Sequence, residues 1–194
     1  MTRLISRLFL AITGWKPEGT RPASRCFVLI AAPHTSNWDL AFLLAIAAIF
    51  EVKLSFVAKR ELFRWPIGGL LRRVGGIPVR RDRRQDLVQQ LIEHLGEASD
   101  LALTIPAEGT RSYVPYWKSG FYHVALGAKV PVVLGFLDYE RKRGGFGPEL
   151  ALTGDPSLDM YAIRAFYSSV KGRHPENAGE IRLKAESDPD RAIG

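Results

Sequence analysis

The chain has 194 residues, of which 46% are hydrophobic and 24% charged, as is ordinary for one folded domain with its own core. No apolar run reaches the roughly 18 residues of a membrane-spanning helix, and the run from Leu40 to Phe50 predicts a buried helix. The single cysteine, Cys26, excludes an internal disulfide and a multi-cysteine metal site. Its apolar neighbours favour a buried side chain, and this cysteine usage fits a reducing, cytoplasmic setting.

The net charge of +7 is concentrated in one segment. Between Lys59 and Asp86, nine basic residues stand against three acidic ones, a local charge of +6, so the rest of the chain is nearly neutral. Such a concentration predicts an anionic partner. Phospholipid head groups, a phosphorylated substrate and nucleic acid are the three alternatives.

Residues 1–15 are predicted to form an amphipathic helix that associates with a membrane. Its apolar face is completed by an aromatic end-anchor and consists of Leu4, Ile5, Leu8, Ala11, Ile12 and Trp15. The alternative is a helix that packs on its own domain. Residues 16–24, with two prolines and a glycine, are expected to form a linker.

Strand-like and helix-like segments then alternate. Apolar runs predict strands at 26–32, 54–58, 76–80, 101–105 and 130–137, and helical periodicity predicts helices at 40–50, 83–96, 120–129 and 158–170. Gly144-Gly145 is expected to turn the chain, so that 147–153 returns as a hairpin partner. The alternation predicts an α/β fold, a single domain over 25–171 with a mixed, mostly parallel sheet flanked by helices. A polar tail, 172–194, follows, in which 181–183 could add an edge strand.

Between the first strand and the helix at 40–50 lies a segment that pairs His34 with Asp39. Five residues on a helix correspond to about 500°, so the two side chains meet only if His34 precedes the helix and Asp39 lies in its first turn. Ser36 as the cap would place Asp39 at the third helical position, in a capping box. One interpretation is therefore structural, with Asp39 as a cap residue and His34 as a turn residue.

The other interpretation is a catalytic dyad. Asp39 would hold one imidazole nitrogen of His34 protonated and leave the other free to take a proton from a hydroxyl. The sequence has no Gly-x-Ser-x-Gly nucleophile elbow, so the hydroxyl would belong to the substrate. Deprotonation of an acceptor alcohol is what direct acyl transfer requires.

Two further segments carry groups suited to an anionic ligand. The turn Glu108-Gly109-Thr110-Arg111 follows a predicted strand, and it combines a glycine that allows close backbone approach with hydroxyl and guanidinium donors. Residues 75–80 place Arg80 at the end of a short strand, where it could meet a phosphate. Each segment alone also fits an ordinary solvated turn or surface arginine.

Together, four segments in this order resemble the blocks of the glycerolipid acyltransferase family, whose best-known members are the 1-acylglycerol-3-phosphate acyltransferases. They are His-x4-Asp at 34–39, Gly-x-x-x-x-Arg ending at 80, Glu-Gly-Thr-Arg-Ser at 108–112 and Val-Pro-Val-Val at 130–133. The resemblance covers about residues 26–139. It departs from the family pattern at Pro33, where asparagine is usual, and at Ala107, where proline is usual.

The resemblance implies a glycerol-3-phosphate acyltransferase-like fold and a role for each matching residue. His34 would be the general base and Asp39 its orienting partner. Arg80 would contact the acceptor's phosphate and Arg111 would be a second anion ligand. The acceptor site would be shaped by the start of the third block, namely Glu108, Gly109 and Thr110.

It also implies the partners. The donor would be a fatty acyl thioester on coenzyme A or acyl carrier protein, and the acceptor a lysophospholipid such as 1-acylglycerol 3-phosphate. No metal or other cofactor and no nucleic acid are expected. The enzyme would lie peripherally on an anionic membrane, at the cytoplasmic face of the inner membrane. Two alternatives remain: an acyl-thioester hydrolase on the same dyad, and a non-enzymatic basic binder of membrane or nucleic acid.

Overall fold

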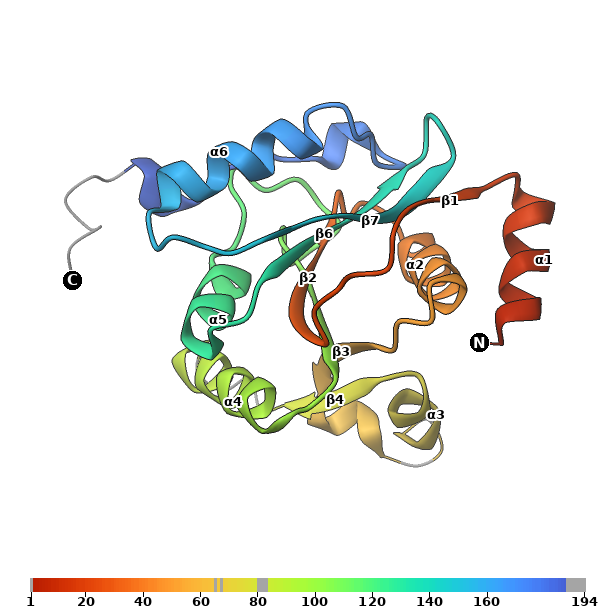
Figure 1. The fold of residues 1–194 in the computed structure, drawn as a ribbon, viewed down its shortest axis with the longest axis horizontal. Coiled ribbons are helices and arrows are strands. Elements are labelled where there is room, and N and C mark those ends of the chain that lie inside the picture. The colour runs from red at the N-terminus through yellow and green to blue at the C-terminus, as the bar shows by residue number, and fades with distance from the viewer. Residues whose placement is uncertain (1, 65, 67, 80–83, 188–194) are drawn as a thin grey trace.

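The fold is built on one seven-stranded sheet with the strand order β1-β7-β6-β2-β5-β3-β4 (Figure 1). The structure, a computed structural model, describes residues 2–64, 66, 68–79 and 84–187. The strands are β1 Lys16–Gly19, β2 Cys26–Ala32, β3 Leu54–Lys59, β4 Gly76–Val79, β5 Leu101–Pro106, β6 Val132–Asp138 and β7 Arg143–Leu150. Neighbouring strands are parallel except for β6 and β7, which are antiparallel. The predicted α/β fold with a mixed, mostly parallel sheet is confirmed.

Helices cover both faces of the sheet. They are α1 Arg3–Thr13, α2 Trp38–Ile49, α3 Gly68–Arg73, α4 Arg84–Glu97, α5 Gly120–Ala128 and α6 Pro156–Tyr167, with short 3-10 turns at Arg60–Phe63, Pro175–Asn177 and Lys184–Ser187. One core contains side chains of α1 and α2, and the other contains side chains of α4, α5 and α6 (Figure 1). The result is three layers with the sheet in the middle.

The central strand β2 shows why the sequence folds this way. Phe27 and Leu29 point into the core shared with α2, whereas Val28 and Ile30 point into the core shared with α5 and α6. All four are at most 2% exposed. A strand buried on both faces is apolar at every position, which explains its continuous apolar run. Burial of one such side chain contributes about 1.5–3 kcal/mol.

The N-terminal region differs from the prediction in two respects. The expected linker contains β1, which pairs in parallel with β7. Trp15 is not an exposed anchor, since it is only 5% exposed and stacks on Phe42 with ring centroids 4.2 Å apart. The predicted anchoring role of Trp15 is therefore wrong, because the indole ties the end of α1 to the domain. The rest of the predicted apolar face, including Leu4 at 77% exposed and Ile12 at 76%, remains open.

The region after β6 also differs from the prediction. Gly144 and Gly145 lie within β7 and do not form the turn, which is made by residues 139–142. A Cβ on Gly145 would lie 1.6 Å from the carbonyl oxygen of Glu18, so glycine is needed there for β1 to approach β7. The consequence for function is that Tyr139 comes directly after β6, at the carboxyl end of that strand.

Candidate active site

Three neighbouring parallel strands end at the same edge of the sheet, and each is followed by a polar side chain. His34 follows the central strand β2, Glu108 follows β5 on one side, and Tyr139 follows β6 on the other. In open α/β sheets, ligands bind outside the carboxyl ends of the strands. The topology therefore gathers these residues where a site is expected, although they are far apart in the chain.

The structure brings His34 and Asp39 into contact. The imidazole Nδ1 lies 3.1 Å from Asp39 Oδ2. The same oxygen accepts hydrogen bonds from the backbone N–H groups of Thr35 and Ser36, each at 2.9 Å. The Tyr139 hydroxyl donates to the other carboxylate oxygen, Oδ1, at 2.7 Å. Asp39 is 5% exposed, so its carboxylate is held from four directions in a mostly dry environment.

These bonds fix the charge state of Asp39. Burial alone would raise the pKa of Asp39, but hydrogen bonds from His34, Tyr139 and Ser36 outweigh it and hold the pKa below its usual value. Asp39 is thus an anion whose carboxylate accepts a hydrogen bond from the N–H at Nδ1 of His34. The opposite nitrogen, Nε2, has no hydrogen-bond partner among the described residues, and His34 lines the larger of two cavities.

The residues at the start of helix α2 also hold the His34–Asp39 pair in place. Ser36 Oγ accepts a hydrogen bond from the N–H of Trp38 at 3.2 Å, and the Ser36 N–H donates to Asp39. The pair resembles the predicted capping box but differs from it, because Ser36 Oγ accepts from Trp38 and not from Asp39. The residue directly before α2 is Asn37, which makes no side-chain capping bond. The prediction that His34 lies before the helix and Asp39 in its first turn is correct, because only this geometry lets both bonds form.

Glu108 lies behind the loop that carries His34. It is 2% exposed, and its Oε1 accepts a hydrogen bond from the backbone N–H of His34 at 3.2 Å. Oε2 is buried and has no hydrogen-bond partner among the described residues. Burial raises the pKa of Glu108. Glu108 lines neither of the two cavities described below. Its contact is with the loop that carries His34 and not with the predicted acceptor site.

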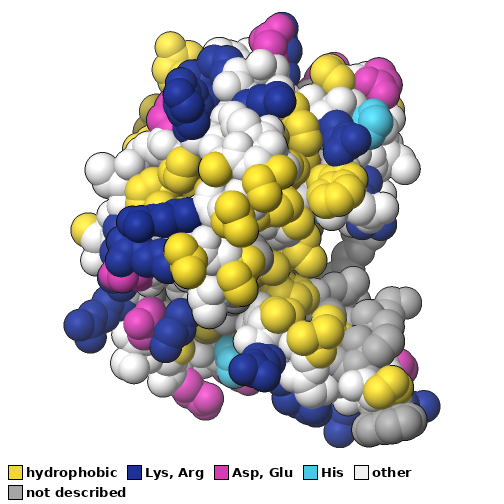
Figure 2. All heavy atoms as spheres, turned by 90° about the vertical axis from the view of Figure 1, so that its right-hand side faces the viewer, with side chains coloured by type: hydrophobic (Ala, Val, Ile, Leu, Met, Phe, Trp, Pro, Cys, Tyr) yellow, Lys and Arg dark blue, Asp and Glu magenta, His cyan; other side chains and the backbone are white. Residues whose placement is uncertain are grey.

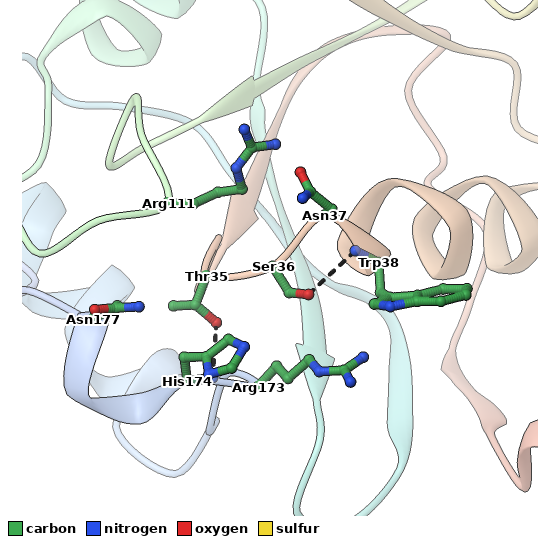
Figure 3. A pocket seen from close by; sticks show the side chains of 8 residues that line it. All are labelled: Thr35, Ser36, Asn37, Trp38, Arg111, Arg173, His174 and Asn177. Carbon is green, nitrogen blue, oxygen red and sulfur yellow. Dashed lines mark hydrogen bonds between the residues drawn. The ribbon is translucent and has the colours of Figure 1, made fainter.

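Two cavities meet at this edge. The larger, about 700 Å³, has His34 and Asp39 among its lining residues. Much of its wall is made of apolar side chains, including Leu43, Phe56, Leu71, Phe136 and Leu137. The smaller, about 430 Å³, is lined mostly by polar and charged residues, namely Thr35, Ser36, Asn37, Trp38, Arg111, Arg173, His174 and Asn177 (Figure 3). Ser36, Asn37 and Arg111 belong to both walls.

Of the other predicted site residues, three line the larger cavity and one lies outside the described residues. Gly109 has a φ of +71°, which favours glycine, and it lines the larger cavity together with Thr110 and Arg111. Arg80, the predicted phosphate contact, lies outside the described residues. Among the described residues, no group of three or more His, Cys, Asp or Glu side chains is placed to hold a metal ion.

A family model described as Acyltransferase matches residues 17–133, more than half of the chain. The chain belongs to the acyltransferase family. A solved structure with a similar fold is that of the 1-acyl-sn-glycerophosphate (LPA) acyltransferase PlsC from Thermotoga maritima, with a TM-score of 0.60 and 18% identity over 87% of this chain and 76% of that one. A comparison with curated proteins gives no match. The family predicted from the four blocks is confirmed, and the structural likeness establishes the acyltransferase fold.

Three residues at the acyltransferase site escaped sequence reasoning. Tyr139 had been assigned no role, yet it holds Asp39. Arg173 and His174 had been placed in a polar tail, yet both line the smaller cavity. For Tyr139 a signal was available, since it directly follows a strand paired with β2. The other two follow a helix at the far end of the chain, and only the folded chain brings them to the catalytic loop.

Proposed function

We propose that this acyltransferase moves a fatty acyl group from an acyl thioester, on coenzyme A or acyl carrier protein, to the hydroxyl of a lysophospholipid such as 1-acylglycerol 3-phosphate. The observation that carries the proposal is the His34–Asp39 pair in the wall of a largely apolar cavity of about 700 Å³. The similar solved structure from Thermotoga maritima is that of an LPA acyltransferase, which agrees with this substrate class. The reaction belongs to phospholipid biosynthesis.

The acyl group passes directly from donor to acceptor at His34, without an acyl-enzyme intermediate. Nε2 takes the proton of the acceptor hydroxyl while the oxygen attacks the thioester carbonyl carbon. The tetrahedral intermediate then collapses, the carbon–sulfur bond breaks, and the imidazolium returns the proton to the leaving thiolate. Asp39 stabilises the imidazolium through Nδ1. General-base catalysis of this kind contributes about 10² to 10⁴-fold, and positioning of the two substrates contributes further.

The apolar cavity suits the fatty chain of the donor. Each methylene that moves from water into such a wall contributes about 0.8 kcal/mol. The side chains that form the wall come from α2, α3, β3 and β6, so the chain would lie across the carboxyl ends of the strands beside the dyad. This orientation would bring the thioester carbonyl to His34.

The protein would reach its lipid substrate by lying on an anionic membrane, at the cytoplasmic face of the inner membrane. On α1, four apolar side chains are exposed, from Ile5 at 55% to Leu4 at 77%. Figure 2 faces this side and shows hydrophobic side chains gathered between clusters of lysine and arginine. Basic residues near an anionic surface contribute about 1 kcal/mol each. Among the described residues, no helix has the length and apolar character to cross a bilayer.

Activity of the His34→Ala variant tests the reaction. With labelled acyl-CoA and 1-acylglycerol 3-phosphate, we expect the acylated product to fall by at least about 100-fold while the thermal unfolding temperature stays unchanged. His123→Ala, which removes an exposed histidine on α5, is the matched control. Full transfer by His34→Ala would refute the mechanism. Thiol release that does not depend on an acceptor would instead identify a hydrolase.

Vesicle flotation tests the membrane proposal. Leu8→Ser on α1 should reduce binding to anionic vesicles, because Leu8 is 61% exposed on the apolar face. Leu158→Ser, at 58% exposed on α6, is the control and should leave binding unchanged. Equal effects of the two variants, or equal binding to neutral vesicles, would count against a docked α1.

A further inference from the structure

Two of the hydrogen bonds that hold Asp39 come from different loops. The N–H of Thr35, in the loop after β2, donates to Oδ2 at 2.9 Å. The hydroxyl of Tyr139, directly after β6, donates to Oδ1 at 2.7 Å. Each loop follows its own strand, so the carboxylate keeps its place against His34 only if the two loops keep theirs relative to each other.

The segment 171–174, which follows α6, is hydrogen-bonded to both loops. The carbonyl of Lys171 accepts from the backbone N–H of Tyr139 at 2.9 Å. The backbone N–H of His174 donates to Thr35 Oγ1 at 3.2 Å, the bond drawn between these residues in Figure 3. These contacts involve the same two residues that donate to Asp39, so four consecutive residues bridge both of its supports.

The segment also starts from a fixed point. Tyr167, the last residue of α6, is 2% exposed. Its hydroxyl donates to the carbonyl of Gly135 in β6 at 2.8 Å and lies 3.4 Å from the carbonyl of Ile30 in β2. The end of α6 is therefore tied to the two strands that carry the two loops, a few residues before the segment reaches the loops themselves.

The fit of the segment against the loop after β2 depends on a glycine. Gly172 is buried, and a Cβ there would lie 2.7 Å from Thr35 Oγ1 and 3.2 Å from Pro33 Cβ. Thr35 is 4% exposed and already bonded to His174, so it has little room to move away. A side chain at Gly172 would thus push the segment off the loop.

We propose that the segment 171–174 is a clamp that positions Asp39, and that Gly172 is the positioning residue that lets the clamp lie against Thr35. The clamp acts through Thr35 and Tyr139 and does not itself supply an atom to the reaction. The inference rests on the proposed function, in which His34 and Asp39 carry out the transfer. Because Arg173 and His174 also line the smaller cavity, the experiments must separate an effect on Asp39 from an effect on that wall.

Kinetics of Gly172→Ala make this separation. We expect kcat to fall by about 10- to 100-fold, because a small displacement of a catalytic group has effects of this size. KM should stay unchanged both for 1-acylglycerol 3-phosphate and for the uncharged 1-acylglycerol. Gly96→Ala is the matched control, since Gly96 is exposed on α4 and a Cβ there meets nothing within 4 Å. A loss confined to KM, or to one acceptor, would overturn the proposal in favour of a cavity effect.

Thr35→Val tests the clamp without adding volume, and so does not depend on how well Gly172→Ala folds. Valine keeps the shape of threonine and removes the oxygen that accepts the His174 N–H. We expect kcat to fall by about 3- to 10-fold, as loss of one uncharged hydrogen bond does. Thr35→Ser keeps the hydroxyl and should retain most of the wild-type kcat. Equal values of kcat in the Val and Ser variants would overturn the role of this bond.

The hydrogen bond between His34 Nδ1 and Asp39 can be followed by NMR without any catalysis. Its proton should give a low-field resonance, assigned by its loss in the His34→Ala protein. We expect this resonance to move upfield in Gly172→Ala and to keep its position in Gly96→Ala. An unchanged resonance in Gly172→Ala would overturn the clamp whatever reaction the dyad performs. Failure of the clamp is therefore distinguishable from failure of the proposed function.

Discussion

The two cavities at the edge of the sheet differ in what they offer a substrate. The larger is mostly apolar, and its wall comes from residues that precede β7 in the chain. The smaller is polar, and part of its wall comes from the segment after α6. They meet at Ser36 and Asn37, beside the dyad. This difference supports the proposal that a fatty chain and a charged head group bind in separate cavities, with His34 and Asp39 near both.

Asp39→Asn acts where the two cavities meet and should have the largest effect. The amide cannot accept every bond that the carboxylate accepts, and it does not stabilise an imidazolium. We expect kcat to fall by about 10² to 10⁴-fold with charged and uncharged acceptors alike. Steady-state assays with the two acceptors measure this. A selective loss with only one acceptor would show that Asp39 belongs to one cavity and not to the reacting centre.

Leu71→Trp alters the larger cavity alone. Leu71 comes from α3 and lines the apolar wall, so a larger side chain there should leave less room for the fatty chain. Each methylene excluded costs about 0.8 kcal/mol, and exclusion of two to three would lower kcat/KM for long-chain donors by about 10- to 100-fold. Short-chain donors should be affected far less.

The comparison across donor lengths provides the internal control for Leu71→Trp. Binding of glycerol 3-phosphate should be unchanged in this variant, because Leu71 does not line the polar cavity. A uniform loss over all chain lengths would contradict an acyl-binding role for the larger cavity.

Tyr139→Phe weakens the support of the dyad without touching either cavity wall. It removes the 2.7 Å hydrogen bond to Asp39 and keeps the edge-on ring contact with Trp15. Hydrogen bonds to a charged group contribute about 1.5–3 kcal/mol, so we expect kcat to fall by about tenfold or somewhat more. An equal fall in kcat with both acceptors, with KM unchanged for each, would mark Tyr139 as a positioning residue for Asp39.

The pH dependence of stability tests this assignment further. Because the folded pKa of Asp39 lies below its usual value, the stability it contributes is present above the unfolded pKa and is lost as the pH falls through the folded pKa. Tyr139→Phe removes one cause of the lowering, so the total loss of stability should be smaller and should be complete at a higher pH. Melting temperatures of the two proteins from pH 7 down to pH 3 measure the shift. Parallel curves would exclude coupling between Tyr139 and Asp39.

The sequence predicted the central strands and the contact between His34 and Asp39 well, because their signals are local. The apolar runs of the central strands are continuous, and the Ser36–Asp39 spacing of a capping box requires His34 to precede the helix. The strand order of the sheet then brings the ends of β2 and β5 together. Physical rules of short range were sufficient to predict the contact between His34 and Asp39.

The segment after α6 could not be predicted in this way. Its polar composition resembles a tail, and the contact between Gly172 and Thr35 joins residues separated by most of the chain. Trp15 was assigned to a membrane surface for a similar reason, since helical spacing does not reveal that Phe42 covers the indole. In each case the deciding contact is tertiary and leaves no periodic signal.

Glu108→Gln should have the smallest effect on kcat. It changes a buried side chain that lines neither cavity but holds the backbone of His34. Because the pKa of Glu108 is raised in the folded protein, its contribution to stability is present below the unfolded pKa and is lost as the pH rises through the folded pKa. Glutamine stays neutral and can still accept the hydrogen bond from the N–H of His34. We therefore expect a melting temperature at pH 7 at least equal to that of the wild type, with kcat within a few-fold.

Glu108→Ala is the informative partner of that variant. It removes the acceptor for the His34 N–H and leaves a buried donor without a bond, which costs about 1–3 kcal/mol. If the role of Glu108 is to hold the loop that carries His34, the Glu108→Ala variant should lose both stability and kcat. The Glu108→Gln variant should lose neither. A large loss of kcat in Gln with normal stability would instead mean that the negative charge of Glu108 acts on the reaction itself, through the 3.2 Å contact with the His34 backbone.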